Sequence, residues 1–387
     1  MRIAVDAMTI CDKEGGVGAG IEHYTWSILF ALVRRAPKHT FYLLVPSVFS
    51  LPSRNAFTLG IKNVRFLTAS SRKLPFFTRH VWHAFRFLLC RPHVLFAPSG
   101  QYPIFWRGKT VATVHDILIY KHPDWFSEEQ RTAFSTRIGV PLAIEHATQL
   151  VTVSRFTERE LHALFPVTVH KTVTIYEGVD VPHEDELTTS HRFPFDRDYV
   201  LFVGTREPRK NLVRAFQAFD RFLQSHPEHA RLSRFIVAGG RGFQGKEIDD
   251  EMHRVNAAWK HLEPHGVIQC LGKVTEEEKW NLLRRATCLF FPSLEEGFGL
   301  PILEAMAVGT PVITSTCGAL EEVGGDVPIY VDPENVEAMS FSIAQCLLVP
   351  EGVSLFKDEG IERAKLFHWN RSSKELLNVL ESFSVPD

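Results

Sequence analysis

The sequence predicts an α/β protein made of two doubly wound, parallel-sheet domains. Short runs of β-branched and aromatic residues alternate with longer segments of helical periodicity along the whole chain, which is typical of parallel sheets built from βαβ units. The length of 387 residues exceeds that of an ordinary single domain. A polar, proline-bearing segment at residues 181–198 separates two halves of similar plan.

Composition describes a globular protein with 45% hydrophobic and 23% charged residues. The net charge of −2 gives no reason to expect nucleic acid as a partner. Six cysteines include no C-x-x-C pair, which argues against a zinc site and against a disulfide framework. No apolar run reaches the length of about 18 residues that spans a membrane, and charges interrupt the N-terminus before a signal-peptide core. We therefore expect a cytoplasmic protein with at most peripheral membrane contact.

The first half is expected to contain a helix at residues 21–35 and a series of short strands. A glycine-bearing loop at residues 15–20 precedes this helix, but Ile21 stands where a dinucleotide fingerprint needs its third glycine. His115 follows the strand 110–114, at the carboxyl end where parallel sheets bind ligands. The expected strands are 2–6, 40–45, 64–67, 93–97, 110–114, 149–153 and 172–176.

Residues 76–90 form an aromatic and basic segment with two interpretations. One is a helix on a membrane surface, with Arg72, Lys73, Arg79 and Arg86 near anionic lipid. The other is an amphipathic helix with its apolar side on the core and its basic side in water. The second interpretation is favoured.

The second half repeats the strand and helix alternation from residue 199 onward. Its first strand leads into the loop GTREPRKN at residues 204–211, and Lys210 is expected to begin the next helix. A cation at the positive end of a helix indicates a shared anion. The expected strands are 199–203, 234–238, 267–271, 288–291, 311–315 and 327–331, and the main helices are 246–262, 276–286, 336–347, one from about 360, and 371–383.

The sequence EEGFGLPILEAMAVGTPV at residues 295–312 dominates the functional prediction. It follows a buried strand, and its glycine loop leads into a helix opened by Pro301, so unpaired amides and the helix dipole favour phosphate there. Gly297 and Gly299 allow close approach of the backbone. Glu296 and Glu304 are good acceptors for sugar and ribose hydroxyls. Acidic residues near a helix start can also have no other role than a favourable interaction with the helix dipole.

This arrangement resembles the E-x7-E signature of retaining glycosyltransferases of family 4, which have the GT-B fold. The loop GAGIEHY, the VHD step ending at Asp116, the turn EGVD at residues 177–180 and the step FHW at residues 367–369 resemble other family features. The resemblance implies two Rossmann-like domains facing across a cleft. They are an acceptor-side domain at 1–180, a linker at 181–198, a nucleotide-sugar domain at 199–369, and a C-terminal helix at 370–387 that crosses back to the first domain.

The resemblance also implies roles for individual residues. His115, Glu296 and Lys210 would be catalytic, with His115 and Glu296 holding the transferred sugar. Glu304 would bind ribose, and Lys210 with one arginine would hold the diphosphate. The family arginine is replaced by Thr205, so Arg206 or Arg209 must substitute. The donor-binding residues would be Gly20, Gly204, Arg209, Lys210, Val274, Phe298, Gly299, Leu300 and Glu304.

The implied reaction transfers a hexose from a nucleotide sugar to a hydroxyl without metal or other cofactor. Similarity to bacterial mannosyltransferases of O-antigen or exopolysaccharide assembly favours mannose from GDP-mannose, with a saccharide or lipid-linked saccharide as acceptor. UDP-glucose or UDP-N-acetylhexosamine is the alternative donor. Asp196 and Asp198 resemble a D-x-D metal motif but precede their strand, so we interpret them as linker charge.

Other classes predict features that can be tested. A nicotinamide dehydrogenase needs the dinucleotide fingerprint, which is broken. A phosphorylase-like enzyme needs a Schiff-base lysine, visible by absorbance. An exported sugar-binding protein needs an export signal. A sugar-nucleotide 2-epimerase would form epimer without acceptor.

Overall fold

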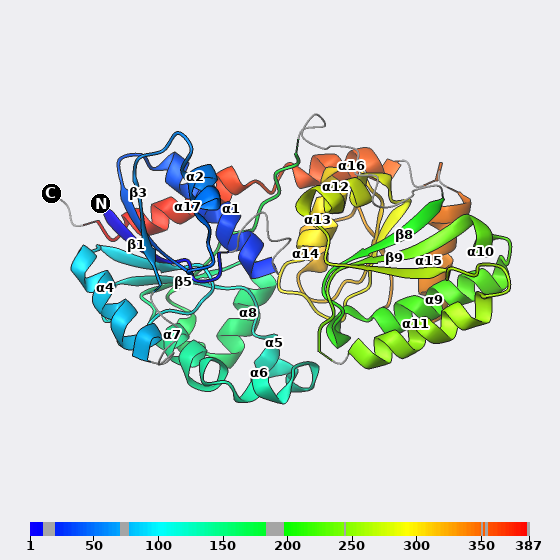
Figure 1. The fold of residues 1–387 in the computed structure, drawn as a ribbon, viewed down its shortest axis with the longest axis horizontal. Helices are drawn as coiled ribbons and strands as arrows, with labels where there is room; N and C mark the ends of the chain where they lie inside the picture. Colours follow the sequence, from blue (N-terminus) through cyan, green and yellow to red (C-terminus); the bar gives the residue numbers. More distant parts are fainter. Residues whose placement is uncertain are drawn as a thin grey trace. The chain divides into compact units, whose positions relative to one another are not determined.

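The computed structural model describes residues 1–10, 20–69, 77–182, 197–243, 245–349, 351–352 and 355–384. It divides into two compact units, Met1–Gly178 with His368–Asp387, and Val179–Phe367 (Figure 1). The C-terminal helix therefore belongs to the same unit as the N-terminus. Most of the glycine loop before residue 20, Arg72 and Lys73, and most of the expected linker lie outside the described residues.

The first unit is built on a seven-stranded parallel sheet with the order β3-β2-β1-β4-β5-β6-β7. The two strands β4 and β5 are buried along their whole length, as expected for a parallel sheet covered on both faces. The strand order reverses between β1 and β4. The strands are β1 (Arg2–Asp6), β2 (Thr40–Val45), β3 (Val64–Thr68), β4 (Val94–Ala97), β5 (Thr110–Val114), β6 (Gln149–Thr152) and β7 (Thr172–Thr174).

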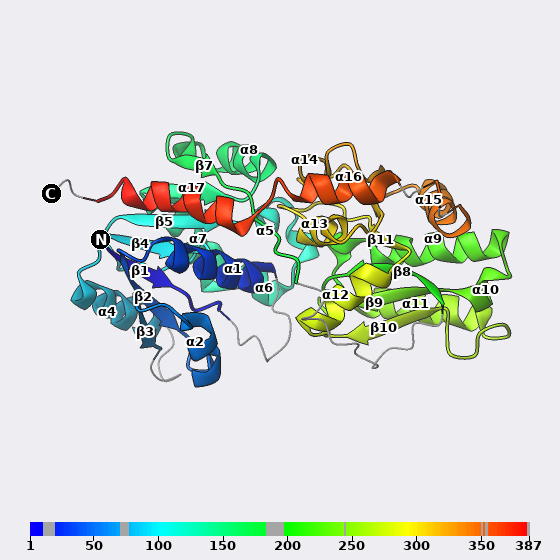
Figure 2. The same ribbon diagram turned by 90° about the horizontal axis from the view of Figure 1, so that it is seen from above.

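Helices cover both faces of this sheet because right-handed crossovers place them on opposite faces when the strand order reverses. Helices α1 (Gly20–Arg35), α2 (Leu51–Thr58) and α17 (Trp369–Glu381) lie on one face (Figures 1 and 2). The other face carries α4 (His83–Cys90), α7 (Val140–His146) and α8 (Arg155–Leu164). The shorter helices are η2 (Thr78–Trp82), α5 (Leu118–Lys121), η3 (Pro123–Trp125), α6 (Glu128–Thr132), η4 (Ser135–Gly139) and η5 (Pro166–Thr168).

Helix α17 is fastened to the first unit by polar contacts at both of its ends. The Ser372 hydroxyl donates to the Tyr176 carbonyl at 2.7 Å, and His39 lies 2.7 Å from the Glu381 carboxylate. The C-terminal segment is thus a structural part of the first unit.

The second unit has a six-stranded parallel sheet with the order β10-β9-β8-β11-β12-β13, which reverses between β8 and β11. The strands are β8 (Asp198–Val203), β9 (Ser233–Ala238), β10 (Ile268–Gly272), β11 (Cys288–Phe291), β12 (Val312–Thr314) and β13 (Ile329–Tyr330). The helices are η7 (Pro208–Lys210), α9 (Leu212–Ser225), α10 (His229–Leu232), α11 (Gly245–Trp259), α12 (Glu276–Arg285), α13 (Leu300–Ala307), α14 (Leu320–Gly324), α15 (Val336–Leu348) and α16 (Leu355–Ala364). Figure 1 shows α9, α10 and α11 together on one side of this sheet.

The expected strands are all present, within a few residues of their predicted bounds. Three local predictions were wrong. Lys210 ends the short helix η7 rather than beginning α9, because Asn211 has a left-handed φ of 59° that separates the two. Helix α16 begins at Leu355, before the predicted start near residue 360. The third concerns α4.

The helical segment η2 and α4 packs one side on the core, as the favoured interpretation expects, but its Arg79 is bound to a buried carboxylate and not solvated. Arg79 makes two hydrogen bonds to the buried Asp6 carboxylate, at 2.9 and 2.7 Å, and Arg86 donates to the Thr68 carbonyl. Large apolar side chains, among them Trp82 and Phe85, are exposed instead. None of the described helices is both long and apolar enough to cross a membrane.

Candidate functional site

The carboxyl ends of β8 and β11 are neighbours in the sheet of the second unit, at the point where the strand order reverses. Open parallel sheets bind ligands at such a point. The loop at residues 204–210 leaves β8, and the loop at residues 292–299 leaves β11 and enters α13. The two loops singled out from sequence are therefore brought together by the fold.

Gly299 is the residue before α13 and has a φ of 105°, a conformation that glycine adopts without strain. A Cβ at this position would lie 2.7 Å from a methyl group of Leu320. Leu300 is the first residue of α13, and Phe298 is buried with its ring 6.0 Å from that of Phe367. The loop thus presents the N-terminal backbone of α13 from a packed support.

A buried cluster of charge joins the two loops. The Glu296 carboxylate accepts from Lys210 Nζ at 2.5 Å and from Arg209 Nη1 at 2.8 Å. Arg209 Nε also donates to Glu207 at 3.1 Å. Burial alone would raise the pKa of Glu296, but the charges of Arg209 and Lys210 outweigh it and lower that pKa to about 2. Glu296 is consequently ionised and holds two cations in fixed positions.

Lys210 is almost fully enclosed, with its Nζ 4.6 Å from the centre of the Phe291 ring. Burial and the neighbouring Arg209 lower the pKa of Lys210, while Glu296 opposes the shift. Gly204, with a φ of 147°, lies beside it, and a Cβ there would be 3.8 Å from Lys210 Cε. The loop after β8 therefore supplies two cations to one carboxylate from the loop after β11.

Arg209, rather than Arg206, lies beside Lys210 and Glu296. The Arg206 guanidinium instead donates to Asp249 at 2.6 Å. Within the described part of the chain its buried Nε has no hydrogen-bond partner. Of the two arginines left open by the sequence, the structure brings Arg209 to the charge cluster.

Glu304 projects from α13 and forms a second buried ion pair, with Lys279 of α12. Lys279 Nζ lies 2.6 Å from the Glu304 carboxylate and 3.0 Å from Glu276. Burial would lower the pKa of Lys279, but the two carboxylates outweigh it and raise that pKa. Sequence reasoning missed Lys279, although its spacing of three and four residues from Leu282 and Leu283 indicated the buried face of α12.

Val274 is buried at the turn between β10 and α12. It precedes Thr275, which caps α12 in a reciprocal arrangement with Glu278. Gly20 and His115 belong to the first unit, whereas the other predicted site residues belong to the second. Gly20 begins α1, and a Cβ added there would meet no atom within 4 Å.

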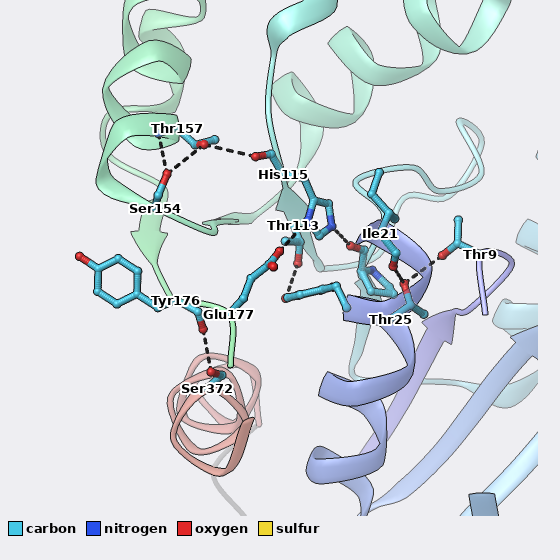
Figure 3. A network of polar contacts seen from close by, with 12 residues as sticks. Thr9, Ile21, Thr25, Thr113, His115, Ser154, Thr157, Tyr176, Glu177 and Ser372 are labelled. Carbon is cyan, nitrogen blue, oxygen red and sulfur yellow. Dashed lines mark hydrogen bonds and ion pairs between the residues drawn. The ribbon is translucent and has the colours of Figure 1, made fainter. Parts of the chain in front are cut away.

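The His115 ring is held by contacts to both of its nitrogens (Figure 3). Nε2 lies 2.8 Å from the Pro98 carbonyl, and Nδ1 lies 3.3 Å from the Glu177 carboxylate. Both partners are hydrogen-bond acceptors. Tyr24 packs edge-on against the His115 ring at 4.6 Å and shares a hydrogen bond with Thr113. A ligand contact through the ring would have to displace one of these partners. Glu177 was not predicted as a partner of His115.

The described residues contain no group of three or more His, Cys, Asp or Glu side chains placed to hold a metal ion. Asp198 begins β8, and Asp196 lies outside the described residues.

Two family models account for almost all of the chain. The model of the glycosyl transferases group 1 matches residues 184–363, and that of Glycosyltransferase Family 4 matches residues 18–182. The O-antigen chain mannosyltransferase B of Escherichia coli is 31% identical over 281 residues, which cover 70% of this chain and 70% of the relative. The chain belongs to glycosyltransferase family 4. The resemblance found in the E-x7-E motif is therefore confirmed.

Further comparisons agree with this glycosyltransferase assignment. The O-antigen chain mannosyltransferase RfbU of Salmonella typhimurium is 25% identical over 292 residues, covering 75% of this chain and 76% of the relative. The sucrose-phosphate synthase of Thermosynechococcus elongatus superposes with a TM-score of 0.71 at 18% identity, over 99% and 98% of the two chains. HepE of Anabaena, solved with UDP and glucose, has a TM-score of 0.70 at 17% identity, over 99% and 100%. The two parallel-sheet units thus constitute the GT-B fold.

Proposed function

We propose that this glycosyltransferase moves a hexose, with retention of anomeric configuration, from a nucleoside diphosphate sugar to a hydroxyl of a saccharide or lipid-linked saccharide. Mannose from GDP-mannose is the favoured donor, and polysaccharide or O-antigen assembly in the cytoplasm is the favoured setting. The two O-antigen mannosyltransferase relatives support this choice. One observation carries the proposal: two buried carboxylates, Glu296 and Glu304, lie on either side of the glycine-loop start of α13, each already paired with a buried lysine.

The charge cluster suits stabilisation of a departing diphosphate. Arg209 and the buried Lys210 are held by Glu296 in fixed positions, so they need little reorganisation when a phosphate gains charge. The backbone amides from Phe298 to Leu300 add the positive end of α13. Stabilisation that grows as the bond to the sugar breaks raises turnover more than it raises affinity. These groups take the role that a divalent ion has in other transferases, so no metal is required.

The two carboxylates are proposed to divide the donor between them. Glu296 contacts the transferred sugar, and Glu304 accepts from the ribose hydroxyls. Lys279 donates to Glu304 Oε1 at 2.6 Å and so fixes the orientation of that carboxylate. Glu296 is occupied by two cations, which makes it a poor covalent nucleophile. This arrangement supports a front-side route through an oxocarbenium-like ion pair.

The donor alternative is UDP-glucose or a UDP-N-acetylhexosamine. HepE of Anabaena has been solved with UDP-glucose, and D-inositol 3-phosphate glycosyltransferases are 24–28% identical to this chain. The experiment is thermal melting of the full chain against a panel of GDP-mannose, UDP-glucose and UDP-N-acetylglucosamine. A ligand at 100 times its dissociation constant adds about 2.7 kcal/mol of stability. GDP-mannose should raise the melting temperature most.

Transfer itself is then measured with the stabilising donor and a saccharide acceptor. Nuclear magnetic resonance of the new linkage should show the anomeric configuration of the donor, and EDTA should leave the rate unchanged. An inverted product would refute retention, and activity lost with EDTA and restored by manganese would refute metal independence. Epimer formed without acceptor would indicate a 2-epimerase instead.

A further inference from the structure

The charges of this glycosyltransferase are distributed unevenly along the chain. Residues 23–115 contain thirteen lysines and arginines and no aspartate or glutamate, so all 45 acidic residues of the protein lie elsewhere. This stretch belongs wholly to the first unit. A net charge of −2 for the whole chain therefore conceals a strongly positive region.

The segment η2 and α4, within this stretch, is apolar on two sides. His83, Ala84 and Phe87 face the core and are buried. On the outer side Phe85, Leu88 and Leu89 are 47%, 57% and 66% exposed. A helix that is apolar all round is ordinarily buried. Because α4 is not, its outer side is an apolar face that the first unit leaves uncovered.

The arginines of this segment hold the apolar face outward. Arg79 is bound to the Asp6 carboxylate and also donates to the Gln101 carbonyl at 3.3 Å. Arg86 is bound to the Thr68 carbonyl. Since both guanidinium groups face protein acceptors, the helix cannot turn its outer apolar residues inward without breaking these bonds.

Neighbouring segments extend the apolar face. The His80 ring lies 5.5 Å from that of Phe134, and its Nδ1 accepts from the Ile104 amide at 3.4 Å. These contacts bring the two neighbouring segments against η2. We define the aromatic surface as the exposed side chains of η2 with its preceding residue, of α4, and of the segments at residues 104–107 and 134–138. They are Phe77, Trp82, Phe85, Leu88, Leu89, Phe105, Phe134 and Ile138.

Exposed arginines accompany the aromatic surface on the same segments. Arg107 follows Phe105 by two residues, and Arg137 directly precedes Ile138. Protein surfaces that lie in the headgroup layer of a bilayer are typically rich in tryptophan and phenylalanine beside arginine. A basic stretch without acidic residues adds attraction to anionic lipid.

We propose that the aromatic surface binds a membrane that contains anionic lipid. Trp82, Phe85, Leu88 and Leu89 enter the boundary between headgroups and acyl chains, and Arg107 and Arg137 contact lipid phosphates. A protein partner would need apolar complementarity, but it would not need 93 residues free of acidic side chains. Such binding is separate from the transfer reaction and places the protein on a surface of anionic lipid.

The position of η2 relates this surface to the ligand side of the first unit. Arg79 reaches Asp6, which ends β1 next to the point where the strand order reverses. Parallel sheets bind ligands at this edge. Membrane binding through η2 and α4 would thus bring a lipid-linked acceptor to the ligand edge of the unit.

The test is flotation of the full-length protein with vesicles of phosphatidylcholine alone or with about one third phosphatidylglycerol, a composition chosen to give a negative surface potential. The variant Trp82→Ser/Phe85→Ser removes two exposed aromatic side chains. Its matched control is Phe341→Ser/Leu348→Ser, which removes two exposed apolar side chains from α15 of the second unit. Circular dichroism and melting temperature establish that both variants are folded.

The wild type and the control should float with the anionic vesicles, and the Trp82→Ser/Phe85→Ser variant should bind at least tenfold more weakly. Raising the salt concentration should release the wild type, because exposed charges are screened. Wild type that ignores anionic vesicles, or a variant that binds them as well as wild type, would overturn the proposal. Equal binding to neutral vesicles would overturn its electrostatic part.

Two further measurements separate the alternatives. If wild type self-associates in gel filtration, ignores vesicles and becomes monomeric in the variant, the aromatic surface is a protein interface and the proposal fails. Transfer to a soluble saccharide acceptor should be the same in wild type and variant. Absence of transfer in both, with vesicle binding as expected, would refute the proposed function and leave the membrane surface in place.

Discussion

Replacing Lys279 with methionine tests whether the second charge pair supports the site. The variant leaves the Glu304 carboxylate, 5% exposed, without the cation that lies 2.6 Å away. Breaking a buried ion pair by removing one partner destabilises by about 3–5 kcal/mol, because the remaining charge is desolvated without compensation. Glu276, the other partner, is 32% exposed and can regain water, so most of the effect should come from Glu304.

A control and a double variant make the prediction specific. Lys365, just after α16, and Glu362 within it form a pair whose side chains are 58% and 70% exposed. Lys365→Met should therefore change stability by about 0–1 kcal/mol. Lys279→Met/Glu304→Leu removes both buried charges and should recover most of the loss.

Hydrogen exchange measured by mass spectrometry is the suitable assay, since the chain has two units that can unfold separately. A loss of about 3 kcal/mol corresponds to roughly 150-fold faster exchange in the protected amides of α12 and α13. Exchange within about fivefold of wild type in Lys279→Met, or no recovery in the double variant, would refute the reasoning, because fivefold is only about 1 kcal/mol.

Four further predictions follow from the site. The folded-state pKa of Glu296 is about 2, below its unfolded value, so Glu296 contributes stability that is present above about pH 4.5 and lost as the pH falls toward 2. Urea unfolding of Glu296→Gln should lack that part of the acid dependence, and an unchanged slope would contradict the pKa. Arg209→Met should lower the turnover number by about 10² or more, whereas Arg206→Met should have the smaller effect, and initial rates with saturating donor decide between them. Glu304→Ala should weaken nucleoside diphosphate binding by about 1–3 kcal/mol in calorimetry, and equal affinities would reduce Glu304 to a structural role. His115→Ala should lower transfer by about 10² at nearly unchanged nucleoside diphosphate affinity. A lower melting temperature with a normal rate per folded molecule would instead show that His115 is structural.

Local sequence determined the fold class and the main loops of this glycosyltransferase. Alternating strand and helix segments specify parallel sheets, and each loop that follows a strand must lie at the carboxyl edge. The E-x7-E motif follows a strand closely and contains its own glycine turn and helix start, so its structure could be predicted without knowledge of distant residues. The expected strands Thr110–Val114 and Cys288–Phe291 have the observed bounds for the same reason.

Only the tertiary structure decided which side chains meet. Arg209 and Glu296 are 87 residues apart in the chain, His115 and Glu177 are 62 apart, and Lys279 and Glu304 are 25 apart. These pairings depend on which strands become neighbours and on the direction in which each side chain points from the loop or helix that carries it. The left-handed Asn211 illustrates this, since it ends η7 after Lys210 and α9 starts beyond it. The outward apolar face of α4 has the same origin, because Asp6, 73 residues before Arg79, turns that arginine inward.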